Sequence, residues 1–133
     1  MKLWSFLDFV DDRGENVIQR WLQSLPPSAR KSVKAKMTAR IEYLEVTPVF
    51  CPPCARDLQG ECEGLFEIRF EISNVQYRPL ACYGPDTTRE VTLLMGAIER
   101  EERFDPPGAC STALRRKALI FADRRYVRPH DFR

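Results

Sequence analysis

The chain has 133 residues, of which 44% are apolar and 11% aromatic, so its size and composition fit one globular domain and exclude a disordered protein. The formal net charge is only +2, but basic residues predominate in residues 20–45 and 100–133, and acidic residues in residues 46–99. The two basic segments are expected to form either solvated helix faces or a surface for a polyanion. No apolar run is long enough to span a membrane, and no signal peptide is visible, so the sequence predicts a cytoplasmic protein without membrane association.

The N-terminal third predicts one strand and two helices. Residues 3–10 form an apolar and aromatic run that favours a strand, and residues 11–14 favour a turn. Apolar residues recur at helical spacing between residues 15 and 25, and Pro26 and Pro27 end this helix and can begin the next. The second helix is predicted by an apolar stripe with spacings of three and four residues, formed by Ala29, Val33, Met37, Ile41 and Leu44. The two helices are expected to form an antiparallel hairpin with one apolar face.

The rest of the chain predicts a meander and a final helix. Residues 47–56, with three prolines, are expected to be a loop, and residues 65–71, 75–83 and 89–97 to be three antiparallel strands joined by turns. In the first of these strands the alternation puts Phe66, Ile68 and Phe70 on one face and Glu67 and Arg69 on the other. After a loop at residues 105–108, Ser111 or Thr112 is expected to cap a helix that ends near Arg125 and is followed by a short polar tail.

Together these elements predict one α+β domain over residues 1–133. It should have a small, mostly antiparallel twisted sheet, an N-terminal helical hairpin packed on one face of the sheet, and a C-terminal helix near its edge.

Two arginines stand among the alternating apolar residues of neighbouring predicted strands. Arg69 lies in the first predicted strand, residues 65–71, and Arg78 lies in the second, residues 75–83. A guanidinium in such a place must reach solvent or meet an anion, because its charge is costly to bury unpaired. The two arginines are therefore expected either to bind phosphate together or to pair with carboxylates of the sheet such as Glu67, Glu71 or Glu90.

The order of three short motifs resembles a known family. The turn Leu58-Gln59-Gly60, the strand Leu65-Phe66-Glu67-Ile68-Arg69 and the strand Tyr77-Arg78 are similar to the phage-derived HigB-like branch of the RelE/ParE toxin superfamily. The resemblance implies a RelE-like fold and a metal-independent endoribonuclease without a cofactor, which cuts messenger RNA on the ribosome and is held inactive by an antitoxin, expected to be a helix-turn-helix protein. It implies catalytic roles for Arg69 and Arg78, because RNA cleavage by the 2′-hydroxyl requires charge neutralisation at the phosphoryl oxygens.

Other residues complete the predicted site. His130 is the only histidine and a candidate acid or base, and Tyr126 could stack on a base; the alternatives are a solvated tail histidine and a tyrosine that packs the end of the last helix. The candidate RNA contacts come from the basic segments and from the region after the third strand: Lys34, Arg100, Arg103, Arg115 and Arg116.

One segment departs from the resemblance. Many HigB-like proteins have a lysine-rich segment after the third strand, whereas this chain has Glu99, Glu101 and Glu102 there, interspersed with Arg100 and Arg103. The acidic residues reduce the local positive potential. An alternative function is therefore a non-catalytic phage protein that uses the same fold as a protein-binding or virion module.

The five cysteines leave a metal or redox role open. Cys51 and Cys54 have the Cys-x-x-Cys spacing, and Cys62 is the nearest further ligand for zinc, but no second such pair exists. We expect no metal site and five reduced thiols, as is usual in the cytoplasm.

Overall fold

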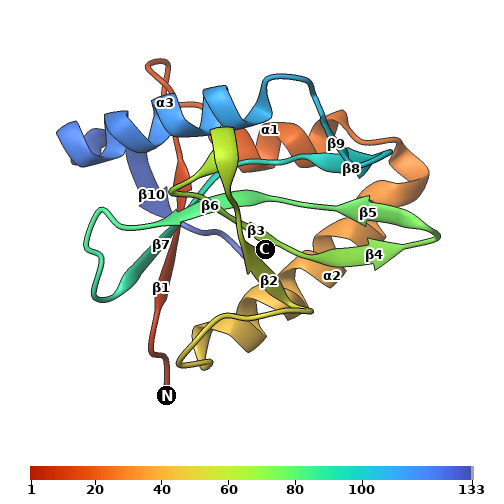
Figure 1. The fold of residues 1–133 in the computed structure, drawn as a ribbon, viewed down its shortest axis with the longest axis horizontal. Coiled ribbons are helices and arrows are strands. Elements are labelled where there is room, and N and C mark those ends of the chain that lie inside the picture. The colour runs from red at the N-terminus through yellow and green to blue at the C-terminus, as the bar shows by residue number, and fades with distance from the viewer. Residues whose placement is uncertain (133) are drawn as a thin grey trace.

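The computed structural model describes residues 1–132 and shows the predicted mixture of helices and mostly antiparallel strands (Figure 1). The helical elements, in chain order, are α1 Val17–Ser24, α2 Pro27–Glu45, the 3-10 turn η1 Gly60–Cys62, α3 Ala109–Ala122 and the 3-10 turn η2 Arg124–Tyr126. The strands are β1 Ser5–Phe9, β2 Ala55–Asp57, β3 Phe66–Ile68, β4 Phe70–Ile72, β5 Val75–Tyr77, β6 Leu80–Tyr83, β7 Glu90–Met95, β8 Ile98–Arg100, β9 Arg103–Asp105 and β10 Val127–Pro129.

Six strands form the main sheet, in the order β10-β1-β7-β6-β3-β2. Only the β1–β7 pair is parallel, and the other neighbours are antiparallel. Directly paired residues share a face of a sheet, so the register sorts the side chains of the main sheet into two sets. Asp8, Leu93, Ala81 and Phe66 lie on one face, and Leu7, Thr92, Cys82, Leu80 and Glu67 lie on the other.

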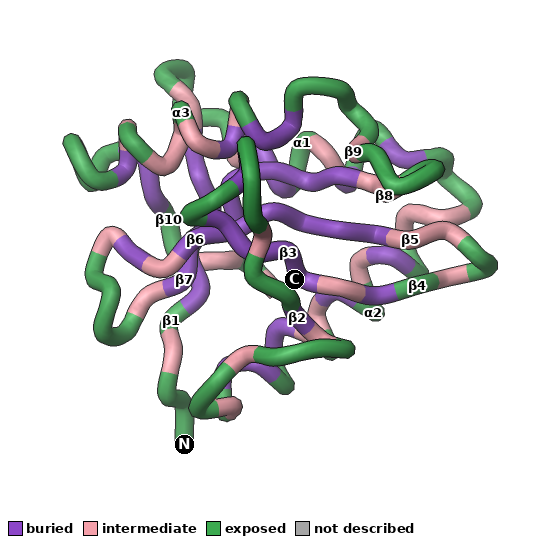
Figure 2. Tube along the Cα trace, in the orientation of Figure 1, coloured by how far each residue is buried: buried purple, intermediate pink, exposed green. Residues whose placement is uncertain are grey.

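The helical hairpin covers the Asp8 face of the main sheet. Asn16 caps α1 by accepting hydrogen bonds from the Ile18 and Gln19 amides, and its side-chain amide donates to Asp8. The helix α2 begins at Pro27, where a missing N–H is tolerated. The predicted stripe is confirmed, because Val33, Met37, Ile41 and Leu44 are all buried. On the opposite face lies α3 (Figures 1 and 2). The Arg116 guanidinium of α3 lies 5.2 Å from the centroid of the Phe9 ring.

The sequence predicted three continuous meander strands. In the structure each of them is interrupted, and the three interruptions lie at nearly the same level of the sheet. The interruptions fall at Arg69, at Arg78-Pro79 and at Gly96-Ala97. The distal halves β4, β5 and β8 form a second sheet together with β9, in the order β4-β5-β8-β9. Proline cannot donate to a strand ladder, which explains the break at Pro79. Arg69 and Arg78 therefore lie at the bend between the two sheets.

Gly96 marks the same bend, where α1 approaches the backbone. A Cβ at this position would lie 1.8 Å from the Trp21 indole, and Gly96 is the one glycine without a positive φ, so the close approach explains why a side chain is excluded. We expect Gly96→Ala to lower the free energy of unfolding by about 1–3 kcal/mol through overpacking. Chemical denaturation measures this loss. Combining Gly96→Ala with Trp21→Leu should recover part of it, and strictly additive losses would contradict the contact.

Three parts of the chain fold differently from the prediction. The expected loop at residues 47–56 leads into β2, the polar tail contains β10, and residues 98–105 form a β8–β9 hairpin. The turn of this hairpin uses Glu101 and Glu102 at φ +51° and +65°, without the glycine or asparagine that usually announces such a turn. The predicted helix caps at Ser111 and Thr112 are also wrong, because α3 begins at Ala109 after Gly108 and ends at Ala122.

A disulfide joins Cys62 in η1 to Cys110 in α3, across 48 positions of sequence. The expectation of five reduced thiols is therefore wrong for these two residues, whereas Cys51, Cys54 and Cys82 are free. The bond fastens α3 to the loop before β3, above the face that carries Glu67. Within residues 1–132, no helix combines the length and the apolarity that a bilayer crossing requires.

Candidate functional site

Arg69 and Arg78 do meet one anion, and this anion is the carboxylate of Glu67. The Nε atoms of Arg56, Arg69 and Arg78 lie 3.4, 3.4 and 3.7 Å from Glu67 Oε2. We call Glu67 and these three arginines the Glu67 cluster. Arg56 reaches it from β2, because the register places Arg56 directly opposite Glu67. From the sequence, Glu67 was predicted only as a possible ion-pair partner of the two arginines. Arg56 was not predicted as part of the site, because it lies in a short strand after a proline-rich loop.

Arg78 is the buried member of the Glu67 cluster. Its Nε donates to Glu99 at 3.0 Å, Nη1 donates to the Tyr77 carbonyl oxygen at 2.9 Å, and Nη2 donates to the Gln76 side chain at 2.7 Å. The residue is only 3% exposed. Of the two alternatives that the sequence left open for Arg78, pairing with carboxylates of the sheet is confirmed, because Glu67, Glu99 and a backbone carbonyl surround its guanidinium.

Glu67 is fully buried, and neither of its carboxylate oxygens has a hydrogen-bond partner among residues 1–132. Burial raises the pKa of Glu67 above its usual value, and the opposing effects of Arg56, Arg69 and Arg78 do not cancel this effect. Such a carboxyl group takes up a proton more readily than an exposed one. Over it lie Arg56, half exposed, and Arg69, whose side chain is 27% exposed. The Glu67 cluster thus joins a proton acceptor to two accessible guanidinium groups.

His130 lies elsewhere. Its Nδ1 is 2.7 Å from Asp8 Oδ1, and Asp8 Oδ2 accepts from the Asn16 side-chain amide at 2.8 Å. Asp8 is on the face opposite Glu67, and β10 and β2 form opposite edges of the main sheet. The structure therefore does not bring His130 together with Arg69 and Arg78, and the single catalytic group that the sequence predicted is split in two.

Tyr126 belongs to neither group. Its ring is buried and stacks on Phe9 at 5.8 Å between centroids. Its hydroxyl donates to Asp12 and accepts from the Arg125 guanidinium, both at 2.8 Å. Tyr126 thus has the packing role that was the alternative to stacking on a nucleotide base. Its buried ring is not available to stack on a base of RNA.

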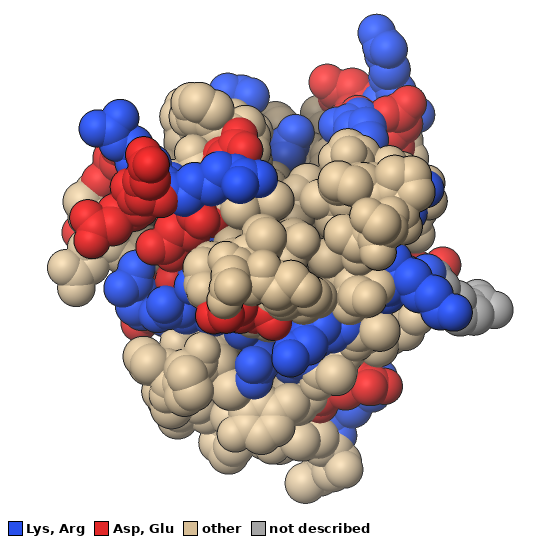
Figure 3. Space-filling view, turned by 90° about the vertical axis from the view of Figure 1, so that its right-hand side faces the viewer, with Lys and Arg blue, Asp and Glu red and all other residues tan. Residues whose placement is uncertain are grey.

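The five predicted RNA contacts do not share one surface. Lys34 lies on α2, on the hairpin side, and Arg115 and Arg116 lie on α3, on the other side of the sheet. Arg100 and Arg103 are exposed on the β8–β9 hairpin, where Arg100 pairs with Asp105 at 3.2 Å. At the end of the molecule that carries the second sheet, basic and acidic side chains are interspersed (Figure 3). A single polyanion surface built from both basic segments is therefore not formed.

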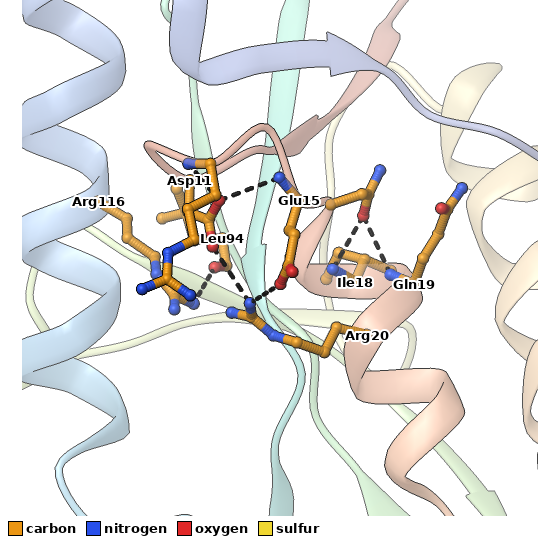
Figure 4. A network of polar contacts seen from close by, with 9 residues as sticks. Asp11, Glu15, Ile18, Gln19, Arg20, Leu94 and Arg116 are labelled. Atoms are coloured by element: carbon orange, nitrogen blue, oxygen red, sulfur yellow. Dashed lines mark hydrogen bonds and ion pairs between the residues drawn. The ribbon is translucent and has the colours of Figure 1, made fainter.

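Arg116 is held inside a polar network at the start of α1 (Figure 4). It donates to the Leu94 carbonyl oxygen at 2.9 Å, and burial lowers the pKa of its guanidinium, with a smaller effect from the nearby charges of Arg20 and Arg115. Arg20 in turn bridges Asp11 and Glu15. Arg116 thus has a structural partner, whereas Arg115 beside it is exposed.

Cys51 and Cys54 remain without the further ligands that a zinc site needs. The nearest predicted ligand, Cys62, is held in the disulfide, and the Cys54 thiol lies 2.6 Å from an Arg40 guanidinium nitrogen. Within the part of the chain that the structure describes, no three histidine, cysteine or acidic side chains are grouped to hold a metal ion.

Comparison with known proteins identified no relative of this chain. No protein-family model, no curated protein and no solved structure matches the chain. A function has to be inferred from the chemistry of its own residues, and the Glu67 cluster brings one carboxylate and three guanidinium groups together on the sheet.

Proposed function

We propose that this chain is a RelE/HigB-like toxin: a metal-independent endoribonuclease that cuts messenger RNA on the ribosome and is controlled by a helix-turn-helix antitoxin. The element order supports the proposal, since a strand, a helical hairpin, an antiparallel meander and a C-terminal helix follow one another as the motif resemblance implies. The observation that carries it is the Glu67 cluster, in which a carboxyl group of raised pKa lies directly beneath two accessible arginines.

These groups match the requirements of RNA cleavage by the 2′-hydroxyl. The ion pairs of Arg56 and Arg69 with Glu67 run through Nε, and in the proposed mechanism their terminal nitrogens bind the phosphoryl oxygens. When Arg56 turns toward the phosphate, Glu67 becomes accessible and accepts the proton of the 2′-hydroxyl. The 2′-oxygen then bonds to phosphorus, the bond to the 5′-oxygen breaks, and that oxygen takes a proton from water. The products are a 2′,3′-cyclic phosphate and a 5′-hydroxyl end. Arg78, buried between Glu67 and Glu99, holds the carboxylate in position.

The test is cleavage of messenger RNA by the purified protein in the presence of bacterial ribosomes. We expect Arg69→Ala and Arg56→Ala each to reduce the cleavage rate by about 100-fold, because each removes charge that faces the developing phosphorane. The matched control is Arg124→Ala, which breaks an exposed pair with Glu90 at 2.9 Å and should leave cleavage unchanged. Wild-type protein that neither cuts ribosome-bound RNA nor slows bacterial growth would refute the proposal.

A second candidate function is a protein-binding or virion module that keeps the fold without the nuclease. The observation in its favour is Arg78, of which every guanidinium nitrogen donates to a group of the sheet, together with the acidic turn at Glu101 and Glu102 that ends the β8–β9 hairpin. This candidate predicts that substitutions at Arg56 and Arg69 change thermal stability only and that no RNA-cleaving activity exists.

A further inference from the structure

A second site lies on the hairpin side of the main sheet. A pocket of about 1080 Å³ opens between α1, α2 and the segment that follows β10. Ile18, Leu22 and Met37 contribute buried apolar side chains to it. The volume is slightly above the usual range for small-molecule sites, and an apolar floor with a few polar groups is the usual construction of such sites.

His130 forms part of the wall of this pocket, and its side chain is only 3% exposed. Asp8, itself fully buried, accepts a hydrogen bond from Nδ1, and the His130 amide donates to the Phe6 carbonyl oxygen at 2.9 Å. Among residues 1–132, Nε2 has no partner. A carboxylate on one ring nitrogen fixes the orientation of the imidazole, so that Nε2 is held in place on the other side of the ring for a ligand.

Positive charge converges on the same pocket from one face of α2. Arg30, Lys31 and Lys34 line it, and neither lysine has an ion-pair or hydrogen-bond partner within the described residues. Arg30 donates through Nη2 to the carbonyl oxygens of Gln23 and Leu25, while its buried Nε remains unpaired. Two acidic residues also line the pocket: Glu15, which is paired with Arg20, and Asp131, which follows His130 in the chain. Several cations around one apolar floor favour a ligand with a dianionic group over a monocarboxylate.

We propose that this pocket binds a phosphomonoester of nucleotide size, with its phosphate between His130 Nε2 and the α2 cations and its remaining part on the apolar floor. The site is separate from the Glu67 cluster, because Asp8 and Glu67 are on opposite faces of the main sheet. It exists whether or not the chain cuts RNA, and its test needs no RNA.

The test is direct because the chain has a single histidine. A carbon-13 label on histidine therefore gives one imidazole signal, that of His130, in a carbon–proton NMR spectrum of the full chain. Adenosine monophosphate should shift this signal saturably with a Kd below about 1 mM. Inorganic phosphate should shift it in the same direction with weaker affinity, and adenosine should not shift it. The result that would overturn the proposal is no saturable shift with adenosine monophosphate up to about 10 mM, or an equal shift with adenosine.

Two lysines of α2 provide matched variants. Lys34→Gln removes a cation from the wall of the pocket and should weaken adenosine monophosphate binding by about tenfold. Lys36→Gln removes the same charge from an exposed position of the same helix outside the pocket and should change the affinity by less than about twofold. Equal weakening by both variants would show a general charge effect and would refute a built phosphate site.

Discussion

Arg78→Ala is expected to lower the free energy of unfolding by about 3–5 kcal/mol, as breaking a buried ion pair does. The substitution leaves Glu67 with Arg56 and Arg69 alone, and it deprives the Gln76 side chain and the Tyr77 carbonyl of their donors. Urea denaturation followed by circular dichroism measures the loss. This result would distinguish the buried Arg78 from a surface arginine, whose removal costs little.

Arg100→Ala is the control for this measurement. Arg100 also pairs with a carboxylate, that of Asp105, but both side chains are more than half exposed, and we expect a loss below about 1 kcal/mol. Equal stability of the Arg78 and Arg100 variants would contradict the buried position of Arg78.

Loss of the Cys62–Cys110 disulfide should cost about 4 kcal/mol on the chain-entropy estimate for a loop that spans 48 positions. Cys110→Ser removes the bond, and so does reduction of the wild-type protein. Both side chains are buried against the core, so the region around η1 and the start of α3 should loosen first. Hydrogen exchange of these segments, together with the denaturation midpoint, measures the effect.

Cys51→Ser is the matched control, because Cys51 is free and exposed. Its stability should equal that of the wild type with and without reductant. If reductant left the wild-type denaturation midpoint unchanged, the disulfide would not contribute to the stability of the fold.

The helical hairpin and the meander could be predicted from the sequence because each has a strong local pattern. The stripe from Val33 to Leu44 repeats at helical spacing, and the meander strands alternate. The bend in the meander was not predicted; at Gly96 it coincides with the close approach of Trp21, which lies 75 positions away in the sequence. The β8–β9 hairpin escaped prediction because two glutamates occupy the positive-φ positions of its turn.

The candidate site was predicted only in part. Pairing with a carboxylate of the sheet was one of two alternatives for Arg69 and Arg78, and the pairing with Glu67 is confirmed, but the periodicity gave no sign that Arg78 would be buried. His130 was singled out because it is the only histidine, yet its partner Asp8 lies at the far end of the chain. Such partners depend on tertiary pairing, on which local sequence patterns carry no information.

The pairing of β10 with β1 has a consequence for the order of folding during synthesis. Asp8 and His130 are 122 positions apart, so the contact between them can form only after nearly the whole described chain has been synthesised. Contacts between such distant segments form late, because the loop between them must be closed first. Until then β1 has an open edge and Asp8 depends on Asn16 for its hydrogen bond. The nascent protein can thus assemble the Glu67 cluster well before it completes the pocket at His130.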